Sequence, residues 1–299
     1  MIVVTGAGGA VGSCLLGELT AIGEPVRAAY HSPAAAQAAD AAGRSVKVVD
    51  FDDPATLAPA LAGAETLFLL NAMGPNQTQQ ELGVLAAAKA AGVRRVVKLS
   101  VWRADELLSP IARLHFPVEE ALRSSGLSWT VLRPNFYMQN FSRGMADPIR
   151  HRGVFAQPRS DAAISYIDVR DVARVAARVL TSSGHESRTY SLTGPEALTY
   201  GEVASLFSKV LGRTVRYVGM SDEEARDALL KRGMPAFQAD ALIESRAAYR
   251  EGGGETLTPT VAELTGRTPI GFEQFVLDHI ATFTVPSGSI PTGAGGAQK

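Results

Sequence analysis

Short apolar runs alternate with alanine-rich amphipathic stretches through the first 135 residues of the chain. The apolar runs are only four or five residues long and rich in β-branched and aromatic side chains, which favours strands over helices. The predicted strands are Ile2–Thr5, Val26–Tyr30, Val46–Val49, Thr66–Leu70, Arg95–Leu99 and Trp129–Leu132.

Start and stop signals frame the helices between these runs. Asp53-Pro54 and Ser109-Pro110 each place a capping side chain before a proline at the first helical position, and glycines follow the helices. The predicted helices lie near Ala10–Ile22, Pro33–Ala42, Pro54–Ala62, Gln77–Ala91 and Pro110–Ser125. Strands joined through single helices pair in parallel by right-handed crossovers. We therefore predict an α/β fold with a doubly wound parallel sheet and a ligand along the carboxyl ends of its strands.

The pattern becomes helix-rich after residue 135. We expect residues 140–163 and 184–283 to form a smaller, helix-rich substrate-binding lobe, and residues 164–183 to return to the sheet domain of residues 1–139. The tail 284–299 is rich in Pro, Gly, Ser and Thr and is expected to be disordered. The further predicted elements are helices near Ser165–Thr181, Tyr200–Leu211, Asp222–Lys231, Ala236–Tyr249 and Gly271–Phe283, strands near Thr189–Leu192 and Val215–Val218, and a flexible connector at Glu251–Gly254.

The first predicted strand runs directly into Gly6-x-x-Gly9-x-x-Gly12. Gly6 permits a tight turn, Gly9 lets the backbone approach a pyrophosphate, and Gly12 lets the next helix pack closely on the sheet. The N–H groups that open this helix would face the phosphates. With 29 glycines in 299 residues the spacing alone is weak evidence. Its place after a buried N-terminal strand favours a Rossmann-type dinucleotide site over an ordinary strand–helix turn.

Composition and charge narrow the class of protein. A net charge of −1 gives no general attraction to nucleic acid or anionic lipid, and no apolar run approaches the length of a membrane span. Met1 opens no basic, signal-like segment, and the single cysteine, Cys14, is expected as a small packing residue of the first helix. We expect a cytoplasmic protein that binds small molecules and no metal, with a homodimer left open.

Further motifs are spread along the chain. They are Thr5–Gly12, Val49–Asp53, Phe68–Asn71, Lys98–Ser100, His115–Gly126, Leu132–Asn140 and Ile167–Ala173. In these motifs residues 1–283 resemble the NmrA-like, NAD(P)H-binding branch of the atypical short-chain dehydrogenase/reductase superfamily. That branch includes quinone- and azo-reductase-like enzymes and non-catalytic redox sensors.

The resemblance implies a cofactor site along the strand ends. Asp50 would meet the adenine edge, Asn71 the ribose and Ser100 the nicotinamide. From the residues alone, Asp50 or Asp53 could instead cap the following helix, Asn71 could hold a loop, and Asp168 reads as a helix-start residue. The residues assigned to the cofactor are Thr5, Gly6, Gly8, Gly9, Ala10, Val11, Gly12, His31, Ser32, Asp50, Phe51, Asn71, Ala72, Ser100, Pro134, Asn135 and Phe136.

The end of the second strand bears on the choice of dinucleotide. Sites that prefer NAD place an acid there to bind the ribose 2′-OH, and this chain has none in Tyr30–Pro33. Many NADP-binding relatives have Arg where this chain has His31. His31 and Ser32 can still donate hydrogen bonds to a 2′-phosphate, so NADP is favoured over NAD.

Ordinary members of the superfamily use Tyr-x-x-x-Lys, in which the lysine assists proton transfer by the tyrosine. This chain has His115 at the tyrosine position and Glu119 at the lysine position. His115 could donate a proton, or the site could lack ordinary alcohol–carbonyl chemistry. Pro117 between the two leaves their helical alignment open. His115 and Ser100 are the candidate catalytic residues.

Hydride transfer to an easily reduced acceptor needs little proton handling by the protein, because water can protonate the product. The predicted substrate residues are Trp102, His115, Asn135, Tyr137 and Met138, with Phe136, Gln139 and Phe141 completing a pocket for a flat aromatic acceptor. These aromatic residues could equally fill the seam between the lobes.

We therefore predict an NAD(P)H-dependent oxidoreductase that acts on a small aromatic or quinone-like acceptor. The alternative is a non-catalytic NAD(P)-binding redox sensor that regulates a partner protein, which the missing Tyr–Lys pair keeps open. A biosynthetic isomerase or reductase acting on a natural product is a third possibility.

Overall fold

The computed structural model describes residues 1–285, and its main element is a parallel sheet of seven strands. The strands are β1 (Ile2–Val4), β2 (Val26–Tyr30), β3 (Ser45–Val48), β4 (Thr66–Leu69), β5 (Arg95–Leu99), β6 (Ser128–Pro134) and β8 (Arg188–Leu192). Their order is β3-β2-β1-β4-β5-β6-β8, so the direction of winding reverses between β1 and β4. The predicted doubly wound α/β fold is confirmed, and this reversal is where such sheets bind ligands.

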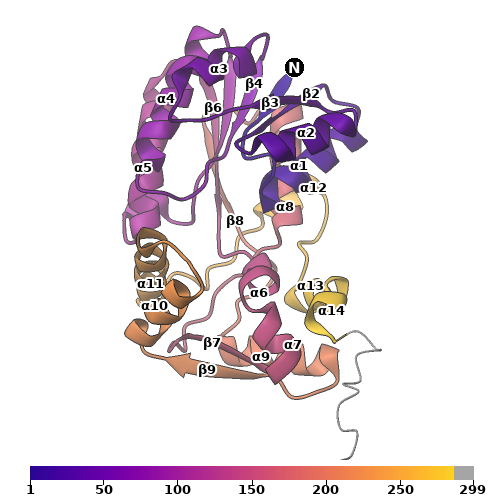
Figure 1. Cartoon of the computed structure of the whole chain (residues 1–299), viewed down its shortest axis with the longest axis vertical. Helices are drawn as coiled ribbons and strands as arrows, with labels where there is room; N and C mark the ends of the chain where they lie inside the picture. The colour runs from indigo at the N-terminus through magenta and orange to yellow at the C-terminus, as the bar shows by residue number, and fades with distance from the viewer. Residues whose placement is uncertain (286–299) are drawn as a thin grey trace, which may run out of the picture.

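Helices cover both faces of the sheet (Figure 1). They are α1 (Ala10–Ala21), α2 (Pro33–Ala41), α3 (Pro54–Leu61), α4 (Gln77–Ala90), α5 (Pro110–Ser124) and α8 (Val169–Thr181). Val4 and Phe68 face the core under α1 and α8, whereas Val3 and Leu67 face the core under α3, α4 and α5. Because both faces of β1 and β4 are buried, these central strands are continuous apolar runs rather than alternating ones.

The predicted caps are present. The Asp53 side chain accepts from the Ala55 N–H at 3.0 Å, and the Ser109 hydroxyl accepts from the Ala112 N–H at 3.1 Å. Asp168 likewise caps α8, as its residue type at a helix start predicts.

A smaller lobe lies beyond the carboxyl ends of the strands, in the lower part of Figure 1. Its core is dominated by aromatic residues such as Phe141, Phe155, Phe207 and Phe272, which meet mostly edge to face. Its elements are α6 (Gln139–Gly144), α7 (Ala146–Arg152), β7 (Val154–Pro158), α9 (Tyr200–Leu211), β9 (Arg216–Met220), α10 (Asp222–Lys231), α11 (Ala236–Arg250), α13 (Phe272–Asp278) and α14 (Ile280–Phe283).

The structure corrects the predicted lobe in two places. β8 pairs with β6 in the main sheet, and α12 (Thr260–Thr265) packs against α8, so neither segment belongs to the lobe expected at residues 184–283. The first half of β8 is exposed, because it forms the edge of the sheet, and its sequence therefore lacks the apolar signature of the central strands. The predicted helix at residues 271–283 is divided at His279 into α13 and α14, and residues 286–299 of the tail lie outside the described residues.

Candidate active site

The glycine turn between β1 and α1 lies where the strand order reverses. Gly6 has a φ of +62°, and a Cβ on Gly12 would lie 2.2 Å from the Gly6 carbonyl oxygen, so this turn needs glycine at both positions. Gly9 caps α1, and its carbonyl accepts the first helical bond from the Ser13 N–H at 2.9 Å. The N–H groups of residues 10–12 therefore have no acceptor within the helix. The residues present fit a dinucleotide pyrophosphate, which would accept from these groups.

Two further predicted cofactor residues follow β2. His31 is exposed, and Ser32 caps α2 by accepting from the Ala35 N–H at 3.3 Å. Thr5 is buried and joins the ends of β1 and β4, because its hydroxyl donates to the Leu70 carbonyl at 2.9 Å. Thr5 therefore links the glycine turn to the end of β4. His31 is exposed to solvent, and its contact with a phosphate stays a prediction.

The ends of β3 and β4 carry the remaining residues predicted for the adenosine half. The Asp50 carboxylate accepts from the Asp52 N–H at 3.0 Å, and Phe51 packs half-buried against the core under α3. The Asn71 amide donates to Gln80 Oε1 at 2.9 Å. This contact supports the alternative in which Asn71 holds the loop after β4. Contact of these residues with a cofactor stays a prediction.

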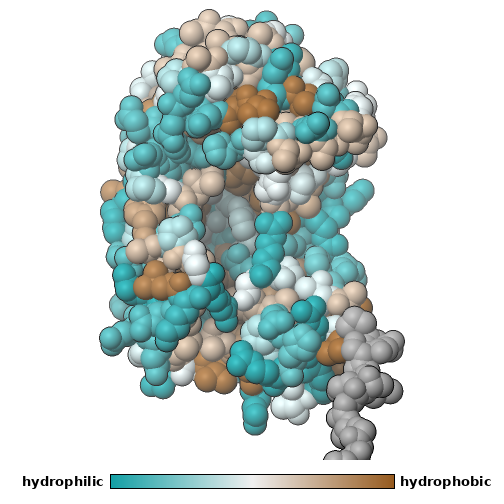
Figure 2. Space-filling model, in the orientation of Figure 1, coloured by the Kyte–Doolittle hydropathy of each residue, from teal (hydrophilic) through white to brown (hydrophobic). Residues whose placement is uncertain are grey.

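A cavity of about 420 Å³ lies between the carboxyl ends of β4–β6 and the smaller lobe. Figure 2 shows the molecule hollowed between its upper and lower parts. Residues from the sequence prediction that line it are Asn71, Ser100, Trp102, His115, Pro134, Asn135, Phe136 and Tyr137. The sequence did not single out other lining residues, among them Gln77, Ile111, Leu242, Arg246 and Tyr249.

Three residues of the predicted acceptor pocket do not line this cavity. Met138 and Phe141 are fully buried in the aromatic core of the lobe, and Gln139 accepts from the Val169 N–H at 3.0 Å to hold the start of α8. The chain turns into α6 at residue 139, which directs these side chains away from the strand ends. The assignment of Met138 to the substrate is therefore wrong, and its alternative as a core residue is right.

The segment 251–254, predicted to be a flexible connector, is hydrogen-bonded to residues at the strand ends. Trp102 Nε1 donates to the Gly253 carbonyl at 2.9 Å, and the Asn135 amide donates to the Gly254 carbonyl at 3.0 Å. The Asn135 oxygen accepts from the Tyr249 hydroxyl at 2.6 Å. Because its polar atoms are already paired, Asn135 supports the wall of the cavity instead of offering its amide to a ligand.

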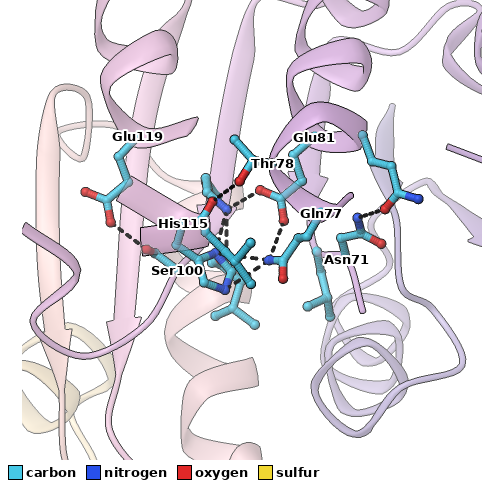
Figure 3. A network of polar contacts seen from close by, with 12 residues as sticks. Asn71, Gln77, Thr78, Glu81, Ser100, His115 and Glu119 are labelled. Carbon is cyan, nitrogen blue, oxygen red and sulfur yellow. Dashed lines mark hydrogen bonds and ion pairs between the residues drawn. The ribbon is translucent and has the colours of Figure 1, made fainter. Parts of the chain in front are cut away.

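A buried charged network lies behind His115 (Figure 3). Lys98 and Glu81, both fully buried, form an ion pair between β5 and α4. Lys98 Nζ also donates to the Leu99 carbonyl at 3.2 Å and lies 3.0 Å from His115 Nδ1. The Gln77 amide nitrogen lies 3.1 Å from both Glu81 Oε1 and His115 Nε2.

This network fixes the state of His115. Burial, and secondly the charge of Lys98, hold the pKa of His115 well below its usual 6.5, so the imidazole is neutral at neutral pH. Lys98 Nζ and the Gln77 amide nitrogen are both donors, whereas a neutral imidazole accepts at only one of its two nitrogens, so the tautomer of His115 depends on which of the two donates to it. The cavity therefore meets a neutral imidazole that lies between two donors, Lys98 and Gln77.

Glu119 does not assist His115. Helix α5 continues through Pro117, yet Glu119 is fully buried and pairs with Arg133 through Nε at 3.0 Å and Nη2 at 2.6 Å. Ser100 also donates its hydroxyl proton to Glu119. Ser100 lines the cavity as an acceptor only, and its role in catalysis stays a prediction.

Two other residues in the cavity wall are tyrosines. Burial raises the pKa of both Tyr137 and Tyr249, so neither has the lowered pKa of a lysine-assisted catalytic tyrosine. Cys14 is half-buried in α1, and burial raises the pKa of its thiol, which agrees with a packing residue.

Two features are absent from residues 1–285. No cluster of His, Cys, Asp and Glu in this part of the chain could hold a metal ion. None of the helices described is long and apolar enough to cross a membrane.

Comparison with known proteins agrees with this geometry. A model of the NmrA-like family matches residues 1–268. The chain belongs to the NmrA-like family. It is 35% identical over 284 residues to an NAD(P)H azoreductase of Xenophilus azovorans, covering 95% of this chain and 99% of that protein.

Two further relatives of this NmrA-like protein are named for reductions. A (4-alkanoyl-5-oxo-2,5-dihydrofuran-3-yl)methyl phosphate reductase of Streptomyces griseus is 39% identical over 287 residues, covering 95% of this chain and 99% of that protein. The solved structure of an NADPH-dependent quinone oxidoreductase from Escherichia coli, complexed with NADPH, matches with a TM-score of 0.84 at 32% identity, over 94% of this chain and 100% of that one. The family predicted from the motifs is confirmed.

A lysine contacts His115 although the family's lysine position holds Glu119. Lys98 lies one residue before the end of β5, and its side chain reaches His115 from the sheet. The sequence contained one signal for it, a lysine between Val97 and Leu99 in an otherwise apolar buried strand. Such a lysine must have a partner, but the sequence did not identify Glu81 as that partner.

Proposed function

We propose that this protein is an NAD(P)H-dependent reductase that passes a hydride to a flat, conjugated acceptor such as a quinone or an azo compound. The observation that carries the proposal is the cavity at the carboxyl ends of β4–β6, which combines apolar and aromatic walls with a neutral His115. Relatives named azoreductase and quinone oxidoreductase, which match along nearly the whole chain, support it.

The residues of the chain would divide the work as follows. The glycine turn would bind the pyrophosphate, and Pro134 and Phe136 in the cavity wall would contact the nicotinamide. When bound, the reduced cofactor supplies a hydride, so the acceptor gains two electrons and needs one proton to become a hydroquinone or hydrazo product. A ring N–H of the neutral His115 would donate a hydrogen bond to the oxygen or nitrogen on which negative charge develops, and water would deliver the proton.

The test is a screen of NADPH oxidation, followed at the absorbance band of reduced nicotinamide, against a panel of quinones and azo dyes. We expect turnover of several acceptors and tight NADPH binding. Tight NADPH binding without turnover of any acceptor would contradict the reductase and favour a redox sensor that acts on a partner protein.

His115→Phe should reduce kcat/KM by about tenfold or less, mainly through KM, since the ring then only shapes the pocket and stabilises charge. Because the pKa of His115 is well below 6.5, wild-type kcat/KM should show no titration of this residue between about pH 6.5 and 8. His151→Phe, on α7 and outside the cavity wall, is the matched control. A hundredfold fall in kcat with unchanged NADPH affinity would instead make His115 the proton donor.

For the cofactor we propose NADPH over NADH, because the exposed His31 follows β2 where an acid would repel a 2′-phosphate. His31→Asp should weaken NADPH binding by about tenfold and leave NADH binding equal or better, as measured by fluorescence titration. Gln37→Asp adds the same charge on the exposed face of α2 and should change neither affinity. A tenfold preference of the wild type for NADH would refute this assignment.

A further inference from the structure

The cavity wall carries positive charge and no negative charge. Its lining includes Arg103 and Arg246 but no Asp or Glu. Arg103 is neutralised, because its guanidinium pairs with Glu106. Arg246 therefore sets the electrostatic character of the cavity.

Arg246 is held firmly by α11 and its neighbours. Its Nε donates to Gln157 Oε1 at 2.7 Å, and its Nη1 donates to the Leu242 carbonyl at 3.3 Å. The guanidinium carbon lies 5.3 Å from the centre of the Phe136 ring. These contacts fix the plane of the guanidinium without any input from a ligand.

The charge of Arg246 has no counter-ion in the described part of the chain. None of the ion pairs among residues 1–285 includes it, and its Nη2 makes no hydrogen bond there. Residues 286–299 contain no Asp or Glu. Neighbouring hydroxyls are already used, since Ser245 donates to its own helix at 2.7 Å and Tyr249 donates to Asn135. Arg246 is half-buried in the cavity wall, and a preorganised guanidinium without a carboxylate partner suits an oxyanion.

The phosphates of the dinucleotide are not the natural partner. They belong at the glycine turn that opens α1, whereas α11 packs against α5 and α10 on the side of the lobe. An anion at Arg246 would share the cavity with the acceptor, beside the Phe136 ring.

We propose that Arg246 binds an anionic substituent of the acceptor, so that this reductase prefers conjugated acceptors that carry a sulfonate, carboxylate or phosphomonoester group. The inference rests on the proposed reductase function, but it concerns only the subsite on α11.

The test compares matched acceptors. The kcat/KM values of naphthoquinone derivatives that carry a sulfonate, a carboxylate or a phosphate ester are each compared with that of neutral naphthoquinone. The comparison is made for the wild type and for Arg246→Met. We expect the variant to lose tenfold or more in kcat/KM for at least one anionic acceptor, mainly through KM. The loss for neutral naphthoquinone should be about a fifth, or less, of the loss for that anionic acceptor, so that the preference for the anion falls.

Two variants control for structure. Arg246→Lys should restore part of the preference for the anion, because it keeps the charge but not the planar fork. Arg250→Met, on the same helix and paired with Asp222 outside the cavity, should leave the preference unchanged. The anionic acceptor with the largest loss of kcat/KM in Arg246→Met identifies which anionic group the subsite binds.

Equal losses for neutral and anionic acceptors in Arg246→Met, or no loss for any, would overturn the proposal. A binding measurement tests the Arg246 subsite independently of the reductase function. The NADPH-loaded protein is titrated with naphthalene sulfonate and with naphthol, and binding is followed by fluorescence. If no acceptor is reduced but sulfonate binding still depends on Arg246, the reductase function fails and the anion subsite stands. If sulfonate and naphthol bind equally in wild type and Arg246→Met, the subsite fails.

Discussion

Replacing Lys98 by Met should destabilise the protein by about 3–5 kcal/mol, because the Glu81 carboxylate would remain fully buried without a counter-charge. The same change removes the ammonium that lies 3.0 Å from His115 Nδ1, so the ring loses its charged neighbour. Urea unfolding at neutral pH measures the loss, which should appear in the midpoint with little change in the slope.

The matched controls separate charge burial from loss of a side chain. Lys98→Met combined with Glu81→Leu should recover much of the stability, since it removes both charges together. Lys47→Met changes an exposed lysine of β3 and should cost no more than about 0.5 kcal/mol. A loss below about 1 kcal/mol for Lys98→Met alone would show that the pair is not buried as the structure has it.

The sheet could be predicted from the sequence because its signals are local. Apolar runs such as Arg95–Leu99 and caps such as Asp53-Pro54 depend on a few adjacent residues, and the structure places these elements within one or two residues of the prediction. The glycine turn is local as well, so its position after β1 could be predicted directly.

The polar core of the site could not be predicted in this way. Lys98, Glu81 and His115 lie on three separate elements, and only the packing of α4 and α5 against the sheet brings them together. The spacing from His115 puts Glu119 at the position of the family's lysine. Its side chain instead meets Arg133 of β6, which spacing within one helix does not reveal.

The part of the cavity wall that the smaller lobe contributes could not be predicted from the sequence either. Arg246 lies on an amphipathic helix whose register relative to the strand ends depends on contacts with α5 and α10. Met138 was misplaced for a related reason, because the backbone turns into α6 one residue later and buries its side chain.

Gly12→Ala should weaken NADPH binding by about a hundredfold, which corresponds to about 2.7 kcal/mol. The added Cβ would lie 2.2 Å from the Gly6 carbonyl oxygen and 2.8 Å from its carbon, and both are backbone atoms that no rotamer change can move away. The turn must open, and the N–H groups of residues 10–12 then no longer converge on one phosphate. Fluorescence titration with NADPH measures the effect.

Gly17→Ala is the matched control, because it makes the same change on the exposed side of the same helix, where no other atom lies within 4 Å of the new Cβ. It should leave NADPH affinity unchanged and raise stability by roughly 0.5–1 kcal/mol, as expected for Gly to Ala within a helix. Thermal unfolding of both variants separates loss of the fold from loss of the site. If Gly12→Ala folds and binds NADPH as tightly as Gly17→Ala does, the pyrophosphate does not lie on this turn, and the cofactor must be placed elsewhere along the strand ends.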